Sequence, residues 1–279
     1  MNFTVLMSVY YQEEPRFLDE SLQSIFDQTL PPTEVILIED GPLTNELDKV
    51  VDSWCEKEKS LKVVKLDQNK GLGEALRIGM GYCSHAIIAR MDSDDISCKD
   101  RFEKQIKFLQ DNPEIDVVGS DIAEFNNDPA ETIAVRRMPC EHGQISATAK
   151  VRCPMNHVSV MFRKEQAISA GSYVLITAGE DYYLWVRMIQ AGAKFANIPE
   201  SLVHVRVGSG MLGRRVGFKY LKGEIKLHTI FFKTGFLTLF EYLRNIMIRA
   251  VMRFLPGKLM SNFYSFLRND RIQGFLADR

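Results

Sequence analysis

Strand-like and helix-like segments alternate along the first 120 residues, and this alternation constrains the fold more than any other feature of the chain. Short runs rich in Val, Ile and Leu are each followed by a segment whose apolar residues recur at helical spacing. This order predicts a parallel sheet whose strands are joined by crossover helices. The strands are expected at residues 3–9, 34–40, 61–66, 86–91 and 116–120, and the helices at 16–28, 45–59, from 71 onward and 100–111.

The pattern is weaker after residue 120. A strand-like run covers residues 159–162, and a further helix is expected at 180–192. From residue 214 to about 268 the chain is predicted to be helical and amphipathic, with an interruption at Pro256 and Gly257.

Charge is unevenly distributed between the body of the chain and its C-terminal part. The whole chain has 35 Lys and Arg against 36 Asp and Glu, but residues 211–279 have 13 basic and 4 acidic residues, which leaves a net charge of −10 on residues 1–210. Charged residues interrupt the apolar runs of this tail, so none reaches the ~18 residues of a membrane-spanning helix. Nucleic-acid binding is not expected, because the tail is too apolar and contains no recognised module.

The tail can instead lie on a lipid surface. Arg244, Arg249 and Arg253 lie among Leu, Ile, Met and Phe, and such a helix can direct basic side chains towards anionic headgroups. Packing on the rest of the protein, or a contact in a homodimer, is the alternative.

Cysteine usage and the N-terminus indicate a reducing compartment. The five cysteines form an odd number without a CxxC pair, which favours neither a disulfide framework nor a zinc site. No basic region precedes the first apolar run, and that run is strand-like, so no secretory signal is expected. We expect a cytoplasmic protein.

Aromatic and acidic residues follow the predicted strands. Tyr10 and Tyr11 follow the first strand, Asp40 ends the second, and the cluster Asp92-Ser93-Asp94-Asp95 (residues 92–95) ends the fourth. The carboxyl ends of parallel strands lie along one edge of a sheet, where ligands bind. Since a base can stack on a tyrosine ring and a carboxylate can accept a hydrogen bond from a base or a ribose, these residues indicate a nucleotide site.

The acidic cluster at residues 92–95 predicts a divalent metal site. Neighbouring carboxylates repel each other unless a cation lies between them. Mg²⁺ or Mn²⁺ would be held by one or two carboxylates and by diphosphate oxygens, and would neutralise a leaving diphosphate. The alternative is that the cluster caps the helix that follows, because Asp and Ser are good N-caps.

Five segments, in matching order over roughly residues 1–205, resemble the nucleotide-sugar-dependent family-2 glycosyltransferases. The resemblance implies an α/β fold of GT-A type, a Rossmann-like and mostly parallel sheet flanked by helices, with a C-terminal helical extension. The combination is most similar to bacterial enzymes that assemble lipopolysaccharide, capsule or exopolysaccharide. The segments are SVYYQEE at 8–14, VILIEDGP at 35–42, NKGLGEAL at 69–76, ARMDSDD at 89–95 with DRF at 100–102, and GEDYYLWVR at 179–187.

The resemblance implies a division of the chain. Residues 1–210 would form the catalytic domain, with a nucleotide-sugar-binding half at 1–120 and an acceptor-binding half at 121–210. Residues 211–279 would form the basic amphipathic helical extension.

The resemblance also implies roles in the donor site. Asp40 would contact the uracil or the ribose, with Tyr10 as a stacking surface, and Asp94 would be the metal ligand beneath the diphosphate. Asp92 would lie near the ribose and share the metal, Mn²⁺ or Mg²⁺. The residues implied in nucleotide binding are Tyr10, Asp40, Asn69, Arg90 and Asp92. A surface ion pair is the alternative for Arg90, and a turn position is the alternative for Asn69.

Asp181 is implied as the catalytic base. Glycosyl transfer with inversion needs a carboxylate that takes the proton of the acceptor hydroxyl while its oxygen attacks the anomeric carbon. Capping of the helix by Glu180 and Asp181 is the alternative. His204 is left open as a further metal ligand, although a structural role is favoured for both His204 and His157.

We therefore expect an inverting, metal-dependent glycosyltransferase that moves one sugar from a nucleotide-diphosphate sugar, with UDP as the nucleotide, to a glycan acceptor. The acceptor is expected to be linked to a polyprenyl diphosphate, and the enzyme to lie at the inner face of the cytoplasmic membrane. Processive relatives have a QxxRW motif and membrane spans, whereas Trp54 and Trp185 lie elsewhere. A homodimer is left open. The alternatives are a non-catalytic nucleotide-sugar-binding or membrane-associated scaffold protein, and a sugar-nucleotidyltransferase, which would have a Gly-rich basic segment where this chain has YYQEEP.

Overall fold

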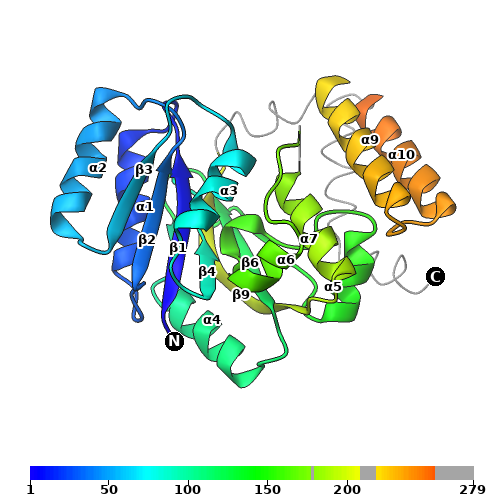
Figure 1. The fold of residues 1–279 in the computed structure, drawn as a ribbon, viewed down its shortest axis with the longest axis horizontal. Helices are drawn as coiled ribbons and strands as arrows, with labels where there is room; N and C mark the ends of the chain where they lie inside the picture. Colours follow the sequence, from blue (N-terminus) through cyan, green and yellow to red (C-terminus); the bar gives the residue numbers. More distant parts are fainter. Residues whose placement is uncertain (177–178, 208–217, 255–279) are drawn as a thin grey trace.

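A computed structural model describes residues 1–176, 179–207 and 218–254 of the chain, and its centre is one nine-stranded sheet (Figure 1). The strands are β1 (Phe3–Val9), β2 (Glu34–Glu39), β3 (Leu61–Lys65), β4 (Ile87–Arg90), β5 (Ile96–Ser97), β6 (Val117–Phe125), β7 (Ala134–Arg136), β8 (Met161–Arg163) and β9 (Phe195–Arg206). The helices are α1 (Pro15–Phe26), α2 (Asn45–Lys57), α3 (Leu72–Tyr82), α4 (Arg101–Asp111), α5 (His142–Ala149), the 3₁₀ turn η1 (His157–Ser159), α6 (Lys164–Ser169), α7 (Glu180–Gln190), α9 (Phe218–Lys233) and α10 (Leu239–Phe254).

The strands lie in the order β3-β2-β1-β4-β8-β6-β9-β5, and β7 pairs with β6 beside this path. From β3 to β4 all pairings are parallel, as the alternation of strands and helices predicts. Beyond β4 the sheet is mixed, because β8 runs antiparallel to both of its neighbours while β6 and β9 are parallel. The expected α/β fold is confirmed, with its parallel strands concentrated in the first half of the chain.

Two long strands depart from the sequence expectations. The strand expected at residues 116–120 continues as β6 to Phe125, and β9 was not expected at all. The two strands pair along their length, with irregular register between Ser120 and Ile122. In β9, Pro199 and Glu200 interrupt the apolar pattern, so the segment is typical of a turn when it is considered alone.

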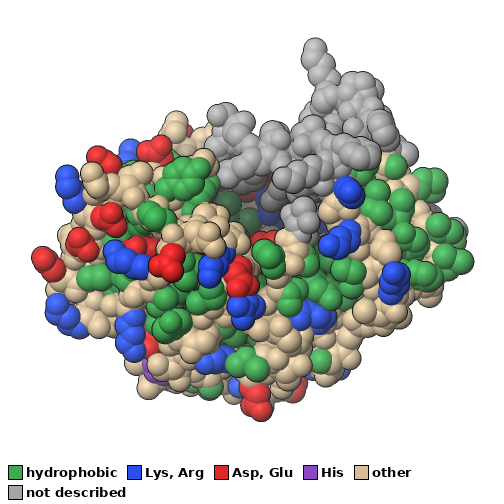
Figure 2. Space-filling view, turned by 45° about the horizontal axis from the view of Figure 1, so that its top comes forward, with side chains coloured by type: hydrophobic (Ala, Val, Ile, Leu, Met, Phe, Trp, Pro, Cys, Tyr) green, Lys and Arg blue, Asp and Glu red, His purple; other side chains and the backbone are tan. Residues whose placement is uncertain are grey.

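The C-terminal helices pack on the rest of the protein. Leu227, Phe231 and Leu237 are buried in a cluster with Ala149, Tyr182 and Val186, which come from α5 and α7. Of the helical tail expected at 214–268, the structure describes residues 218–254, which form a hairpin of α9 and α10 that turns near Gly235. The interruption at Pro256 and Gly257 lies outside the described residues. Within the part that is described, no helix is long and apolar enough to cross a membrane. In Figure 2 hydrophobic side chains gather at the right of the molecule, where Figure 1 places this hairpin.

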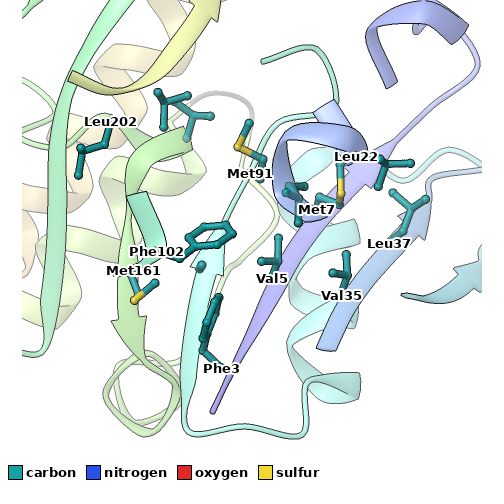
Figure 3. Packing of buried hydrophobic residues seen from close by; sticks show 14 of the residues in the cluster. Phe3, Val5, Met7, Leu22, Val35, Leu37, Met91, Phe102, Met161 and Leu202 are labelled. Atoms are coloured by element: carbon teal, nitrogen blue, oxygen red, sulfur yellow. The ribbon is translucent and has the colours of Figure 1, made fainter. Parts of the chain in front are cut away.

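The central strands are buried on both faces. Val5 and Met7 of β1 point towards α1, α2 and α4, whereas Leu6 points to the opposite face, which α3, α6 and α7 cover. Figure 3 shows the first of these layers, in which Phe102 of α4 lies over Phe3 with ring centroids 5.1 Å apart. Because both faces are covered, a ligand can approach these strands only at their ends.

Gly41 shapes the end of β2. Its φ angle is +88°, and a Cβ atom there would lie 2.6 Å from the backbone nitrogen of Asn69. The loop that leads into α3 therefore approaches β2 more closely than any residue with a side chain allows.

Gly41→Ala is expected to lower the free energy of unfolding by about 3 kcal/mol, because it combines a left-handed backbone with a backbone clash. The melting temperature should fall by roughly 6 to 12 °C. Gly81→Ala is the matched control, since a Cβ there meets nothing within 4 Å and α3 should become slightly more stable. Equal melting temperatures for the two variants would contradict this account of Gly41.

Candidate active site

Asp40 lies directly after β2 and is only 3% exposed. Its Oδ1 accepts a hydrogen bond from the backbone nitrogen of Lys70 at 2.7 Å, and its Oδ2 accepts one from Gly71 at 2.9 Å. The side-chain amide of Asn69 donates back to the carbonyl oxygen of Asp40 at 3.2 Å. Asp40 and Asn69 thus join β2 to the start of α3, and a contact of either residue with a nucleotide stays a prediction.

Tyr10 and Tyr11 follow β1 at the same edge of the sheet. Their rings meet edge to face with centroids 5.8 Å apart, and Tyr11 is exposed. Tyr10 is half-buried, so part of its ring is available to stack on a planar ligand. Figure 2 is turned so that this edge of the molecule comes forward.

The cluster at residues 92–95 brings three carboxylates together. Asp92, Asp94 and Asp95 each offer an oxygen atom, and these atoms lie within 4.8 Å of one another. Across the described residues this is the one group of three or more carboxylate, imidazole or thiolate ligands at such a spacing. Oxygen ligands of this kind suit Mg²⁺ or Mn²⁺, and the donor set therefore fits the metal that the sequence predicts.

The electrostatics of the cluster favour a bound cation. Burial, together with the charges of Asp92 and Glu13, raises the pKa of Asp94 to about 7. Burial and the charges of Asp94 and Asp92 raise the pKa of Asp95 well above its usual range. Without a cation, the folded protein therefore resists full ionisation of the cluster.

The surrounding protein fixes the backbone of this cluster. Arg206 of β9 donates from Nε to the carbonyl oxygen of Asp94 at 3.1 Å, and its backbone nitrogen donates to Oδ1 of Asp95 at 2.8 Å. Ser21 of α1 donates to the carbonyl oxygen of Asp92 at 2.8 Å. The cluster does not cap α4, which begins only at Arg101, so the capping alternative is wrong.

Arg90 is the last residue of β4 and links this strand to the 92–95 cluster. Its side chain is 1% exposed and forms an ion pair with Asp92, while Arg101 donates to its carbonyl oxygen at 2.8 Å. The alternative of a surface ion pair is therefore wrong, because this guanidinium is buried. Among the described residues, its Nε has no hydrogen-bond partner, and a contact of Arg90 with the nucleotide stays a prediction.

Glu180 and Asp181 form the first turn of α7, which packs against the first turn of α3. A Cβ atom on Gly73 would lie 3.1 Å from Cβ of Glu180, so the two helices approach each other closely here. Oδ2 of Asp181 accepts a hydrogen bond from the thiol of Cys153 at 3.4 Å. Burial is the main cause that raises the pKa of both acids, and the positive charge of Arg90 acts on both in the opposite direction.

The two histidines lie outside the carboxylate cluster. His204 on β9 pairs in register with Ile96 of β5, and its buried Nδ1 has no hydrogen-bond partner in the part of the chain that the structure describes. His157 shares a hydrogen bond of 2.9 Å with the hydroxyl of Tyr173. Burial lowers the pKa of both imidazoles, which favours their neutral forms. A role of His204 as a metal ligand stays a prediction.

Sequence reasoning missed several residues that surround the site. Arg206, Cys153 and Tyr173 lie outside the five segments on which the sequence resemblance rests. Arg206 lies in a strand that was not expected, and the other two lie in the weakly patterned stretch after residue 120. The only sequence signal for these three residues was indirect. The carboxylates at 92–95 lie close together and need hydrogen-bond donors around them, but the sequence does not say which residues supply these donors.

Comparison with known proteins identifies relatives of the whole chain. A family model described as glycosyl transferase family 2 matches residues 4–168. An uncharacterized glycosyltransferase of Haemophilus influenzae is 40% identical over 96% of this chain and 100% of that protein. The amylovoran biosynthesis glycosyltransferase AmsE of Erwinia amylovora is 38% identical, covering 94% of this chain and 97% of the relative. The UDP-Gal:alpha-D-GlcNAc-diphosphoundecaprenol beta-1,3-galactosyltransferase of Escherichia coli is 36% identical, covering 94% of each chain.

Two solved structures share the fold. The mannosyltransferase PcManGT from Pyrobaculum calidifontis, in complex with GDP-Man and Mn²⁺, has a TM-score of 0.65 at 16% identity and covers 99% of this chain and 84% of its own. S. aureus TarS 1–349 in complex with UDP-GlcNAc has a TM-score of 0.64 at 16% identity, over 82% of this chain and 66% of that one. This chain spans 39% of the longer TarS chain. At such identity the likeness shows the fold, and it confirms the GT-A type.

Asp94→Asn is expected to stabilise the metal-free protein at high pH. The pKa of Asp94 is raised from 3.8 to about 7 in the folded state, so wild-type protein loses stability as the pH rises between these values, whereas the neutral amide does not. In EDTA, the variant should melt above wild type at pH 8, and the difference in melting temperature should be smaller at pH 5. Saturating Mn²⁺ should raise the wild-type melting temperature more than that of the variant.

Thermal denaturation at four pH values, with EDTA or Mn²⁺, measures both effects. Asp52→Asn, which changes an exposed carboxylate on α2, should show neither of them. If the melting temperatures of Asp94→Asn and wild type differed by the same amount at every pH, the electrostatic account of the cluster would be contradicted.

Proposed function

Because the chain belongs to glycosyltransferase family 2, we propose that it is an inverting, metal-dependent glycosyltransferase. It transfers one sugar from a UDP-sugar to a lipid-linked glycan during the synthesis of a bacterial surface polysaccharide. The observation that carries this proposal is the convergence of two acidic groups. The 92–95 cluster and the pair Glu180 and Asp181 come from distant segments, and the charge of the buried Arg90 acts on both of them.

The proposed chemistry divides these residues between the two sides of the transferred sugar. When bound by Asp92 and Asp94, Mn²⁺ or Mg²⁺ would neutralise charge on the leaving diphosphate. Asp181 takes the proton of the acceptor hydroxyl as that oxygen bonds to the anomeric carbon and the bond from this carbon to the diphosphate oxygen breaks. Burial supports the role of Asp181, since a carboxylate with a raised pKa is a stronger base.

The relatives support the proposed substrates. One relative, similar over nearly its whole length, is named for UDP-Gal and for a GlcNAc unit on diphosphoundecaprenol, and another is named for amylovoran biosynthesis. We therefore take UDP-galactose as the first donor to test, followed by other UDP-sugars and GDP-mannose. The first acceptor is α-D-GlcNAc diphosphate on a long alkyl chain. Transfer of a single sugar, rather than processive addition, stays a prediction, as does a homodimer.

Asp181→Asn is expected to lower kcat by roughly a thousandfold, because general base catalysis contributes about that much. Calorimetric binding of UDP in the presence of Mn²⁺ should change less than twofold. Glu165→Gln is the matched control, since Glu165 also lies in the first turn of a helix, α6, but away from the carboxylates. Undiminished turnover by Asp181→Asn would show that the base is a different residue. If the protein were a non-catalytic scaffold, even the wild type would transfer no sugar.

The outer face of α10 supports a place for the enzyme on the inner face of the cytoplasmic membrane. Four apolar side chains project from it at helical spacing, and two of them, Phe240 and Met247, are 75% and 63% exposed. An apolar stripe of this kind can enter a lipid interface. Arg249 does not take part, because it donates inward to the carbonyl oxygen of Val151 at 2.8 Å. The stripe is formed by Leu239, Phe240, Leu243 and Met247.

Removal of the exposed stripe should weaken membrane binding. The double variant Phe240→Ser and Leu243→Ser is expected to bind vesicles that contain phosphatidylglycerol at least tenfold more weakly than wild type, since each buried side chain contributes about 2 kcal/mol. Co-sedimentation measures the bound fraction. Ile133→Ser, which removes an exposed apolar side chain far along the chain from α10, is the control. Equal binding by the double variant and wild type would refute the proposed surface.

Deletion of the whole tail is a poorer test of the same surface. Tyr182 and Val186 of α7 are buried in a cluster with residues of α9 and with Leu237, so a chain that ends before α9 would expose them next to Asp181. Point changes on the outer face of α10 leave this packing intact.

A further inference from the structure

The inner face of α10 holds a short turn, residues 149–153, that follows α5. The side-chain amide of Asn245 donates to the carbonyl oxygen of Lys150 at 2.7 Å, and Arg249 donates to that of Val151 at 2.8 Å. The ammonium of Lys150 forms an ion pair with Glu241 at 2.8 Å. Three contacts from one helix therefore fix both the backbone and a side chain of this turn.

The opposite side of the 149–153 turn contacts the first turn of α7. The thiol of Cys153 donates to Oδ2 of Asp181 at 3.4 Å, and the hydroxyl of Tyr182 donates to the carbonyl oxygen of Ala149 at 2.6 Å. The turn thus lies between the C-terminal hairpin and the carboxylate proposed as the base.

Asn245 is a polar residue in an apolar interface. It is 0% exposed, close to the cluster that contains Leu227, Phe231 and Tyr182, and it also lies 3.4 Å from Nδ1 of His228. Apolar packing alone tolerates small shifts of one helix over another, whereas a buried amide is satisfied in only one arrangement. Asn245 therefore fixes the position of α10 relative to the 149–153 turn.

We propose that Asn245 is a positioning residue for Asp181, and that the C-terminal hairpin acts through the 149–153 turn to place the catalytic base. The hairpin is then a part of the catalytic machinery in addition to any contact that its outer face makes. A displacement of a reacting group by about 1 Å can lower a rate by roughly a hundredfold. The inference rests on the proposed function, because it takes Asp181 as the base.

Asn245→Leu is the first test, since leucine has a similar volume and suits a helix but cannot hold the carbonyl of Lys150. In the full-length enzyme, kcat is expected to fall at least tenfold, while binding of UDP with Mn²⁺ stays within twofold of wild type. Amide hydrogen exchange should become faster at residues 149–153 and 180–184, and this readout needs no substrate.

Gln190→Ala is the matched control. Its side-chain amide also joins the catalytic domain to the hairpin, donating to the carbonyl oxygen of Thr234 at 2.9 Å, but it lies at the far end of α7. Gln190→Ala should change neither kcat nor the rate of amide hydrogen exchange at residues 149–153 and 180–184.

Substitution of Cys153 tests the same connection from its other end. Cys153→Ala should reproduce the fall in kcat with intact UDP binding, and Cys153→Ser should restore most of the activity, because the hydroxyl can again donate to Asp181. An unchanged kcat in Asn245→Leu or Cys153→Ala would overturn the inference, as would an equal loss of kcat and UDP binding.

The failure of this inference can be told apart from failure of the proposed function. If Asp181→Asn is inactive and Asn245→Leu is fully active, the base assignment stands and only the positioning role is lost. If Asp181→Asn turns over normally, the proposed base is itself wrong.

Discussion

Repulsion among Asp92, Asp94 and Asp95 is the constraint around which the rest of the site is arranged. These carboxylates lie within 4.8 Å of one another and are partly or fully buried, so the free protein can ionise them only at a cost in stability. Arg90 and Arg206 compensate in part, one through an ion pair and the other through hydrogen bonds to the backbone and to Asp95. The remaining negative charge suits the site to a divalent cation.

The sequence predicted the parallel half of the fold because each of its units is local. A strand, its crossover helix and the next strand follow one another, and their apolar spacing identifies each of them. The mixed half could not be predicted in this way. β9 contains Pro199 and Glu200 and becomes a strand only through its pairing with β6, whose residues lie about 80 positions earlier in the chain. Tertiary pairing overrides local propensity in such a segment.

The position of the site could also be predicted, but not the contacts within it. Strand order alone places Asp40 and the 92–95 cluster at one edge. It does not reveal that Asp40 holds the backbone of Lys70 and Gly71, or that Arg90 is buried. The helical tail was recognised as amphipathic, yet only packing shows that its inner face contacts α5 and α7 while its outer face is exposed. These features depend on residues distant in sequence, for which a single chain offers no pattern.

The hydrogen bond between Asp95 and Arg206 has a consequence for the protein during its synthesis. The two residues are 111 positions apart, and Arg206 is the last residue of β9. The ribosome makes the chain from its N-terminus, so β1 to β4 leave the exit tunnel long before β9 does. The growing polypeptide therefore has its acidic loop without the arginine that holds it.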